Sequence, residues 1–95
     1  MAVAVELNFP GATLEQYDQV IKKMGLRQGG PMPDGGISHW VTKTDDGFRV
    51  VDIWESKEQF ERFAQEQIGP LSREAGIEQQ PEIRFVEVHN YLVRT

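Results

Sequence analysis

The chain has 95 residues, 39% hydrophobic and 26% charged, which suits one domain over residues 1–95 with a modest core. Ten Lys and Arg stand against fifteen Asp and Glu, and a net charge of -5 repels phosphate backbones, so we expect no nucleic-acid partner. Without a cysteine or a long apolar run, the chain has no disulfide, no thiolate chemistry and no membrane span, and a cytoplasmic location is the simplest expectation.

Alternating apolar residues over 3–9 predict a first strand, which Pro10-Gly11 ends. Thr13 and Gln16 then form a capping-box pattern, so we expect a helix over residues 14–24. Gly25 supplies the left-handed residue that closes such a helix.

The next segment, residues 25–36, holds five glycines and two prolines and predicts a loop. A loop of this length is either the lid or rim of a binding site or a plain flexible connector.

Residues 37–43 and 48–54 predict a β-hairpin, because both are rich in β-branched and aromatic residues and a Thr-Asp-Asp-Gly turn joins them. If the two aspartates form a two-residue loop, His39 lies directly opposite Asp52. If the loop is one residue further on, Val41 faces Asp52 instead. His39 and Asp52 share a face in both registers, because side chains in a strand alternate with a period of two.

A second capping pattern at Ser56 and Gln59 predicts another helix, with its buried stripe at Phe60, Phe63, Ala64 and Ile68. We expect Gly69-Pro70 to break this helix, and one short helical turn to follow before Gly76. Residues 83–93 predict the last strand.

The two predicted helices look like a repeat, because TLEQYDQVIKKMG and SKEQFERFAQEQIG share a hydroxyl cap, an EQ pair, an aromatic and a final glycine. Each helix follows one strand and precedes another, which gives the order βαββαβ. The predicted fold class is therefore α+β: a ferredoxin-like four-stranded antiparallel sheet with both helices on one face.

One sheet face would then lack helices, although both faces of the hairpin carry large apolar groups. We expect the face with His39, Asp52 and Trp54 to be the open one. A homodimer through this open sheet face would bury it, and the pair would point into a shared interior. Which row of the first strand faces that interior stays open, although its apolar row is the better match for the helices.

The strand order and the run VVDIWESKEQFERF, with GISHW and VHNYL, resemble the dimeric α+β barrel superfamily, and in particular small antibiotic-biosynthesis-monooxygenase-like proteins of unsettled activity. The resemblance covers nearly the whole chain and implies a homodimeric barrel. It names no reaction, because this superfamily includes cyclases, isomerases, oxygenases, haem-degrading enzymes and ligand binders. Haem-degrading members take an axial histidine from a helix, and neither predicted helix has one, so we expect no cofactor.

The two histidines lie far apart and give no metal-ligand spacing, so we expect no metal site. His39 and Asp52 are the candidate catalytic pair, because a carboxylate orients an imidazole for proton transfer to or from an enol, a phenol or an α-carbon. The alternative is a cross-strand polar pair that satisfies itself. The candidate substrate-binding residues are Trp54, His89, Asn8 and Tyr91.

Two functions follow from this sequence. The first is a cofactor-free oxygenase, cyclase or isomerase that acts on a small apolar or polyketide-like substrate through His39 and Asp52. The second is a non-catalytic ligand-binding or dimerisation module.

Overall fold

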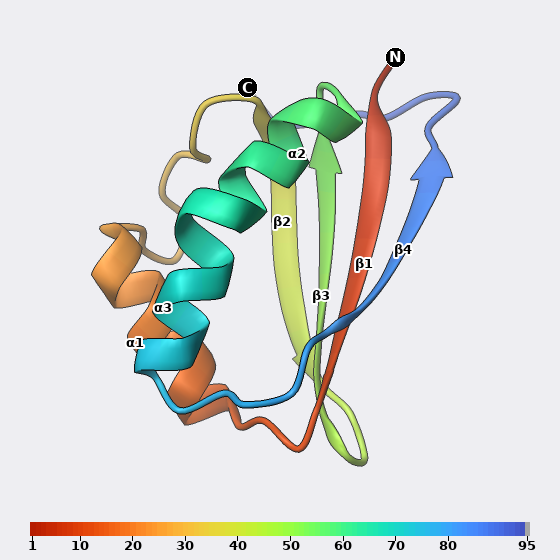
Figure 1. Ribbon diagram of the computed structural model, residues 1–95. Coiled ribbons are helices and arrows are strands. Elements are labelled where there is room, and N and C mark those ends of the chain that lie inside the picture. Colours follow the sequence, from red (N-terminus) through yellow and green to blue (C-terminus); the bar gives the residue numbers. More distant parts are fainter. Residues whose placement is uncertain (95) are drawn as a thin grey trace.

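The computed structural model describes residues 1–94 of the chain. Its elements are β1 (Val3–Pro10), α1 (Leu14–Met24), β2 (Gly36–Lys43), β3 (Gly47–Trp54), α2 (Lys57–Phe63), the π-helical segment η1 (Ala64–Ile68), α3 (Gly69–Glu74) and β4 (Glu82–Glu87). The strands form one antiparallel sheet in the order β2-β3-β1-β4, and the helices lie together on one side of it (Figure 1). The predicted α+β class and ferredoxin-like arrangement are confirmed.

Local capping signals place α1 where the sequence predicts it. The Thr13 side chain accepts from the Gln16 backbone N–H at 3.1 Å, and the Gln16 side chain accepts from the Thr13 N–H at 2.9 Å. Gly25 takes a left-handed conformation with φ of 79°, and the Leu26 N–H reaches back to the Ile21 carbonyl. Both helix ends are thereby satisfied by the chain itself.

The prediction that Gly69-Pro70 breaks the second helix is wrong. The helix runs from α2 through η1 into α3, and Gly69 keeps a right-handed helical conformation. The Gly69 N–H bonds the Ala64 carbonyl, five residues back, so the helix widens by one residue before the proline. A π-type turn therefore admits a proline, which lacks an N–H and would crowd the preceding turn of a regular α-helix.

The last strand is also shorter than predicted, because β4 ends at Glu87 rather than near Val93. Among residues 1–94 its one partner strand is β1, which begins at Val3, opposite Glu87. One further hydrogen bond joins the Val88 N–H to the Ala2 carbonyl, and beyond it β1 offers no backbone for pairing.

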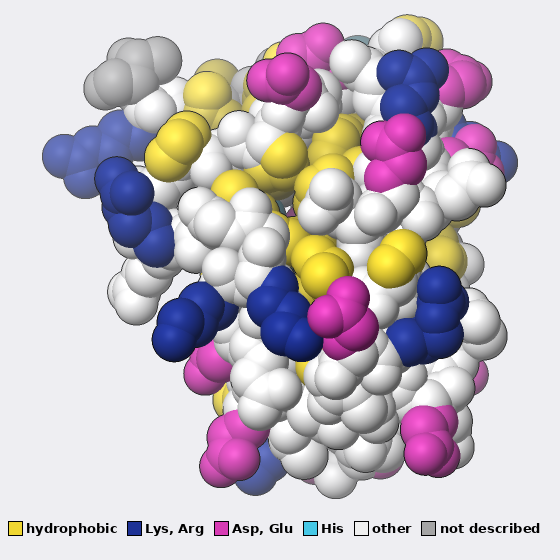
Figure 2. Space-filling view, turned by 60° about the vertical axis from the view of Figure 1, so that its left-hand side comes forward, with side chains coloured by type: hydrophobic (Ala, Val, Ile, Leu, Met, Phe, Trp, Pro, Cys, Tyr) yellow, Lys and Arg dark blue, Asp and Glu magenta, His cyan; other side chains and the backbone are white. Residues whose placement is uncertain are grey.

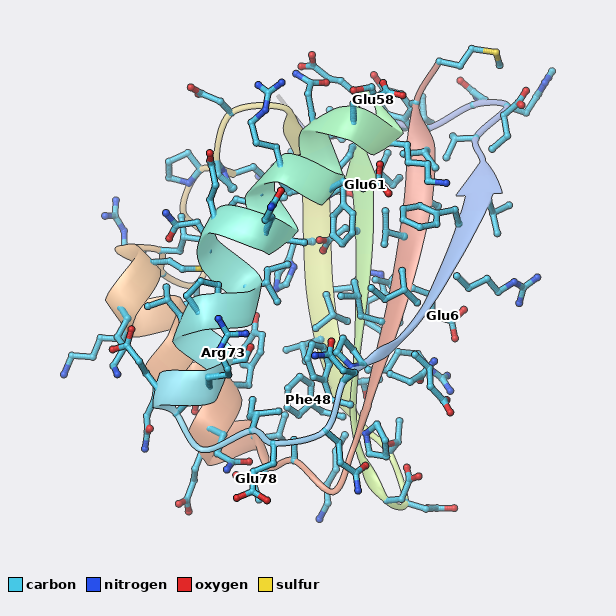
Figure 3. The ribbon with its side chains drawn as sticks, in the orientation of Figure 1. Glu6, Phe48, Glu58, Glu61, Arg73 and Glu78 are labelled. Carbon is cyan, nitrogen blue, oxygen red and sulfur yellow. The ribbon has the colours of Figure 1, made fainter. Side chains whose placement is uncertain are left out.

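The helices cover the sheet face that we expected to be open, so that assignment is wrong. The apolar row of β1 pairs with the even-numbered row of β3: Phe9 opposite Phe48, Leu7 opposite Val50, Val3 opposite Trp54. These side chains form the core, and Trp54 is fully buried. Figure 3 shows Phe48 between sheet and helices and Glu6 on the other side.

The uncovered face has one apolar and one polar region. In the apolar region, Trp40 is 54% exposed and lies opposite Val51 on the neighbouring strand. Val86 is 46% exposed and lies on the same face as Ile53, with β1 between them. In the polar region, Arg49 on β3 bonds Asn8 and Glu6 on β1. Among the described residues, no helix has the length and apolar character needed to cross a membrane.

Candidate functional site

A cavity of about 540 Å³ lies between the sheet, the helices and the loop over residues 25–36. Figure 2 shows a hollow on the side of the molecule where α1 and this loop lie, with apolar side chains gathered around it. The apolar lining includes Val20, Ile21, Met24, Leu26, Met32, Phe48, Phe63 and Ile68. The volume falls within the range of small-molecule sites.

His39 and Asp52 lie side by side on the wall of this cavity. Of the two hairpin registers that the sequence leaves open, the structure has the one in which Asp45 and Asp46 form the loop: His39 is the direct partner of Asp52, and the Thr44 N–H bonds the Gly47 carbonyl across the turn. His39 Nδ1 lies 2.6 Å from Asp52 Oδ1. The Asp52 side chain is 5% exposed and that of His39 is 26% exposed, so the imidazole is the more open partner.

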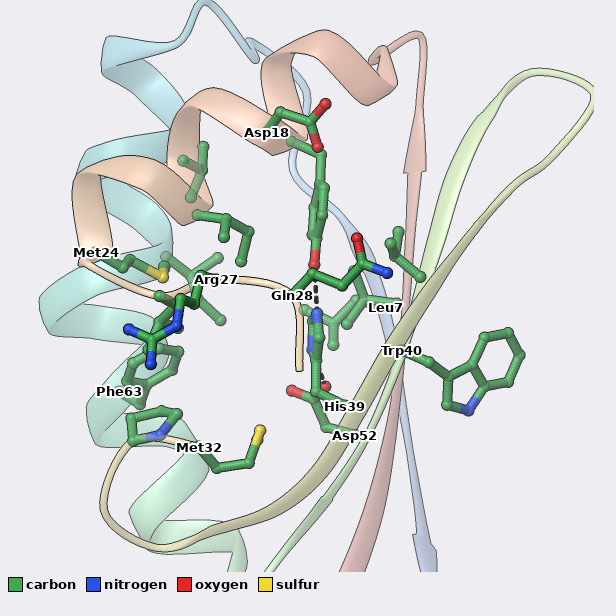
Figure 4. Close-up of a pocket in the computed structure, with 18 of the residues that line it drawn as sticks. Leu7, Asp18, Met24, Arg27, Gln28, Met32, His39, Trp40, Asp52 and Phe63 are labelled. Carbon is green, nitrogen blue, oxygen red and sulfur yellow. Dashed lines mark hydrogen bonds and ion pairs between the residues drawn. The ribbon is translucent and has the colours of Figure 1, made fainter. Parts of the chain in front are cut away.

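Figure 4 shows both side chains reaching from the sheet toward Met24, Met32 and Phe63, whereas the ring of Trp40 points the opposite way. The pair thus belongs to the cavity within one chain. This corrects the expectation that His39 and Asp52 point into a space shared by two subunits, and the reason is the helix-covered face described above.

Trp54 holds the second oxygen of the buried carboxylate. Its indole Nε1–H donates to Asp52 Oδ2 at 3.0 Å, two residues along the same strand. The indole itself packs against two rings: Phe60 lies edge-on with 5.8 Å between ring centroids, and the centroid of Phe63 lies 5.1 Å away. A carboxylate in the core is costly unless it is hydrogen-bonded, and here both oxygens have a donor.

Tyr17 is the site residue that the sequence analysis missed. It lies on α1, and its hydroxyl is 2.5 Å from His39 Nε2. Its ring packs edge-on against the ring of Phe48, with 5.5 Å between the ring centroids. The signal was present in the sequence: on the apolar stripe of α1, Tyr17 is the one side chain with a polar end, among Leu14, Ile21 and Met24. Such an end needs a partner when buried.

Burial raises the pKa of the Tyr17 phenol to about 12, and the charges of Asp52 and Asp18 add to that effect. The phenol is therefore protonated at neutral pH. Asp52, as a carboxylate, only accepts hydrogen bonds, so His39 carries a proton on Nδ1. With a neutral imidazole, the chain of donors then runs from Tyr17 O–H to His39 Nε2 and from His39 Nδ1–H to Asp52.

The other predicted binding residues lie elsewhere. Asn8 is on the uncovered face, where its side chain accepts from Arg49 Nε at 2.7 Å. His89 and Tyr91 follow the end of β4 and are exposed, and neither lines the cavity. The structure thus brings together His39, Asp52 and Trp54 and leaves these three apart. Within residues 1–94 there is no cluster of three His, Asp or Glu residues that could hold a metal ion.

Fold and cavity together define a class: an α+β protein with a ferredoxin-like sheet whose helix-covered face encloses a small-molecule-sized cavity. No protein-family model and no curated protein matches the sequence. Solved structures do match. One is from Deinococcus radiodurans and is named as a candidate antibiotic biosynthesis monooxygenase; it has a TM-score of 0.61 and 13% identity over 100% of this chain and 99% of its own.

Two further solved structures share the fold. A conserved protein from Methanosarcina mazei has a TM-score of 0.60 and 10% identity over 90% of this chain and 91% of its own. SnoaB from Streptomyces nogalater, named as a cofactor-independent oxygenase, has a TM-score of 0.55 and 16% identity over 98% of this chain and 96% of its own. The predicted resemblance to antibiotic-biosynthesis-monooxygenase-like proteins is confirmed at the level of the fold.

Proposed function

We propose that this protein is a cofactor-free enzyme that removes a proton from an enol or phenol of a small, mostly apolar substrate. The observation that carries the proposal is the imidazole of His39 on the cavity wall, 2.6 Å from the buried carboxylate of Asp52. In this role His39 is the acid–base residue, and Asp52 orients its ring and stabilises the imidazolium that forms.

The direction of the hydrogen bonds assigns the reactive nitrogen. Nδ1–H is committed to Asp52, so Nε2 is the nitrogen that takes a proton. Trp54 supports this assignment, because its indole holds the other oxygen of the carboxylate and thus its orientation. In this proposal Trp54 also lines the substrate cavity.

Removal of an enol or phenol proton begins an oxygenation, a cyclisation or an isomerisation. Oxygenation is the favoured case, because a structural relative is named as a cofactor-independent oxygenase. Dioxygen is then the co-substrate. An anthrone and O₂ give an anthraquinone and water: one oxygen atom becomes the new carbonyl, and the other leaves as water with the two hydrogens of the methylene carbon.

The uncovered sheet face supports a homodimer as the working form. Trp40 at 54% exposure lies next to Val51 in the sheet, and an open apolar sheet face of this kind is typical of an interface. Two copies that pack these faces together would form the dimeric α+β barrel over residues 1–95 that the sequence predicts. The expected cytoplasmic location stays a prediction.

Anthrone in aerated buffer tests the proposed activity, with anthraquinone absorbance and oxygen uptake as the two readouts. The wild-type protein should form anthraquinone at least tenfold faster than buffer, with one O₂ consumed per product. His39→Gln and Asp52→Asn should bring the rate to within about threefold of buffer, since acid–base catalysis contributes on the order of 10²–10⁴-fold. Asp45→Asn, in the exposed hairpin turn, is the matched control and should keep the wild-type rate. Equal rates for the wild type and His39→Gln would contradict the role of His39.

A second function, a ligand-binding module without chemistry, is favoured by one observation. Among the described residues, every buried side-chain nitrogen and oxygen already has a hydrogen-bond partner. A self-satisfied network of this kind also suits a purely structural pair. A protein that binds anthrone but leaves its oxidation rate unchanged would be this module.

A further inference from the structure

Tyr17 forms the cavity end of the buried hydrogen-bond chain, beyond His39. We propose that Tyr17, rather than His39, meets the substrate, and that it selects ligands whose polar group is a hydrogen-bond donor, namely phenols and enols. This inference rests on the proposed function and names the ligand class and a further catalytic residue of the same site.

Both ring nitrogens of His39 are occupied, Nδ1 by Asp52 at 2.6 Å and Nε2 by the Tyr17 hydroxyl at 2.5 Å. Tyr17 itself lines the cavity and is only half-buried. A ligand therefore reaches the imidazole through the phenol oxygen, unless it first breaks the bond between Tyr17 and His39.

The hydrogen bonds from Tyr17 through His39 to Asp52 all point the same way. With neutral His39, the only hydroxyl proton of Tyr17 is donated to Nε2, and the phenol oxygen keeps a free lone pair. That oxygen offers the ligand an acceptor and no donor. A phenol or enol O–H satisfies it, whereas a methyl ether or an isolated carbonyl brings a second acceptor.

The same arrangement moves a proton with all atoms accounted for. The ligand O–H proton passes to the oxygen of Tyr17 as the Tyr17 proton passes to His39 Nε2. The ligand becomes an oxyanion, Tyr17 ends neutral, and His39 becomes an imidazolium beside the carboxylate of Asp52. Tyr17 then donates its new proton toward the oxyanion, so the chain stabilises the product of the step that it performs.

A matched pair of probes tests the ligand class: 2-hydroxyanthraquinone and 2-methoxyanthraquinone, which differ by one methyl group on the oxygen. Binding is followed by quenching of tryptophan fluorescence, since Trp54 lines the cavity. Wild-type protein should bind the hydroxy compound about tenfold more tightly, as expected for one hydrogen bond with a partly buried acceptor. In Tyr17→Phe this preference should disappear.

Ionisation of the bound probe tests the proton transfer, because the absorption of 2-hydroxyanthraquinone moves to longer wavelength when its hydroxyl ionises. On wild-type protein the probe should ionise at a lower pH than in buffer. This shift should be lost in both Tyr17→Phe and His39→Gln. Tyr91→Phe removes the other tyrosine, which lies outside the cavity, and should behave as the wild type.

Difluorotyrosine separates a proton-conducting role from a structural one. In the Tyr91→Phe background, Tyr17 is the only tyrosine, so 3,5-difluorotyrosine replaces it alone. This residue keeps the hydroxyl and its hydrogen bond but is more acidic, so the pH at which the bound probe ionises should move. No movement, in a variant that still prefers the hydroxy probe, would overturn proton transfer through Tyr17.

The outcomes also separate this inference from the proposed function. A Tyr17→Phe protein that keeps both the tenfold preference and the shifted ionisation would show that His39 meets the ligand directly; the inference then fails and the acid–base function stands. Wild-type protein that binds both probes equally overturns the donor selection while the cavity remains a binding site. Wild-type protein that binds neither probe would overturn both this inference and the proposed function.

Discussion

Two polar networks cross the sheet of this protein, one on each face, and they differ mainly in burial. On the uncovered face, Glu6, Asn8 and Arg49 form a network of exposed or half-exposed side chains, with 43% exposure for Arg49. On the helix-covered face, Asp52 is 5% exposed and shares its oxygens between His39 and Trp54. Water screens and replaces the first network, whereas burial of Asp52 protects the second from this screening.

This difference gives the two networks different uses. A solvated ion pair contributes little and tolerates change. A buried chain is costly to disrupt but holds each hydrogen bond in one direction, which acid–base chemistry requires. The two networks should therefore respond differently to substitution.

Asp52→Ala should produce the largest loss of stability. It leaves the buried indole N–H of Trp54 and the Nδ1–H of His39 without their acceptor. We expect the free energy of unfolding to fall by about 3 kcal/mol, measured by urea denaturation followed by circular dichroism. A loss below about 1 kcal/mol would mean that the buried network is no stronger than the exposed one.

Trp40→Asp should weaken the proposed homodimer by about 2 kcal/mol, roughly 30-fold in the dissociation constant, because it replaces the exposed indole of the apolar region by a charge. Sedimentation velocity over a concentration series measures this change. Gln65→Asp, on the exposed side of the helical segment, adds the same charge and should leave association unchanged. If wild-type protein is already monomeric at every concentration, the dimer proposal is wrong.

Tyr17→Phe should cost about 1 kcal/mol at neutral pH, the typical worth of one hydrogen bond. The wild type should also lose stability in alkali. The pKa of Tyr17 is about 12 in the folded protein against an ordinary 10.0, so the unfolded chain releases this proton first. Stability from Tyr17 is therefore fully present below pH 10 and is lost as the pH rises toward 12.

Titration of tyrosinate absorbance in a Tyr91→Phe background measures Tyr17 alone. A midpoint near 12 is expected. A midpoint near 10 would mean that the Tyr17 phenol is not buried beside Asp52 as described above.

Glu6→Gln should have the smallest effect, within about 0.5 kcal/mol, because its partner Arg49 is 43% exposed. The same urea denaturation used for Asp52→Ala measures it. The difference between the two losses of unfolding free energy measures how much more the buried network contributes to stability than the exposed one. Similar losses for both would indicate that burial does not distinguish the two faces.

Much of the fold and part of the site followed from local rules. The bounds of α1 match their prediction because its capping groups are neighbours in sequence. The shared face of His39 and Asp52 follows from the alternation of side chains along the hairpin. The turn sequence allows two registers, and the structure has the one that places the two residues directly opposite each other. Two wrong predictions concern Gly69-Pro70 and the end of β4, where a π-type turn and the length of a partner strand decide the outcome. A third wrong prediction concerns the sheet face that the helices cover.

Local patterns in the sequence were enough to predict the order of the elements, the shared face of His39 and Asp52, and the apolar stripe of each helix, because each depends on residues close together in the chain. The sheet face that the helices cover could not be predicted in this way, since both faces of the hairpin are apolar enough to be buried. That choice placed the pair in a cavity within one chain and brought Tyr17 to His39, 22 residues away. Contacts of this kind depend on how α1 packs across the sheet, which no local pattern encodes.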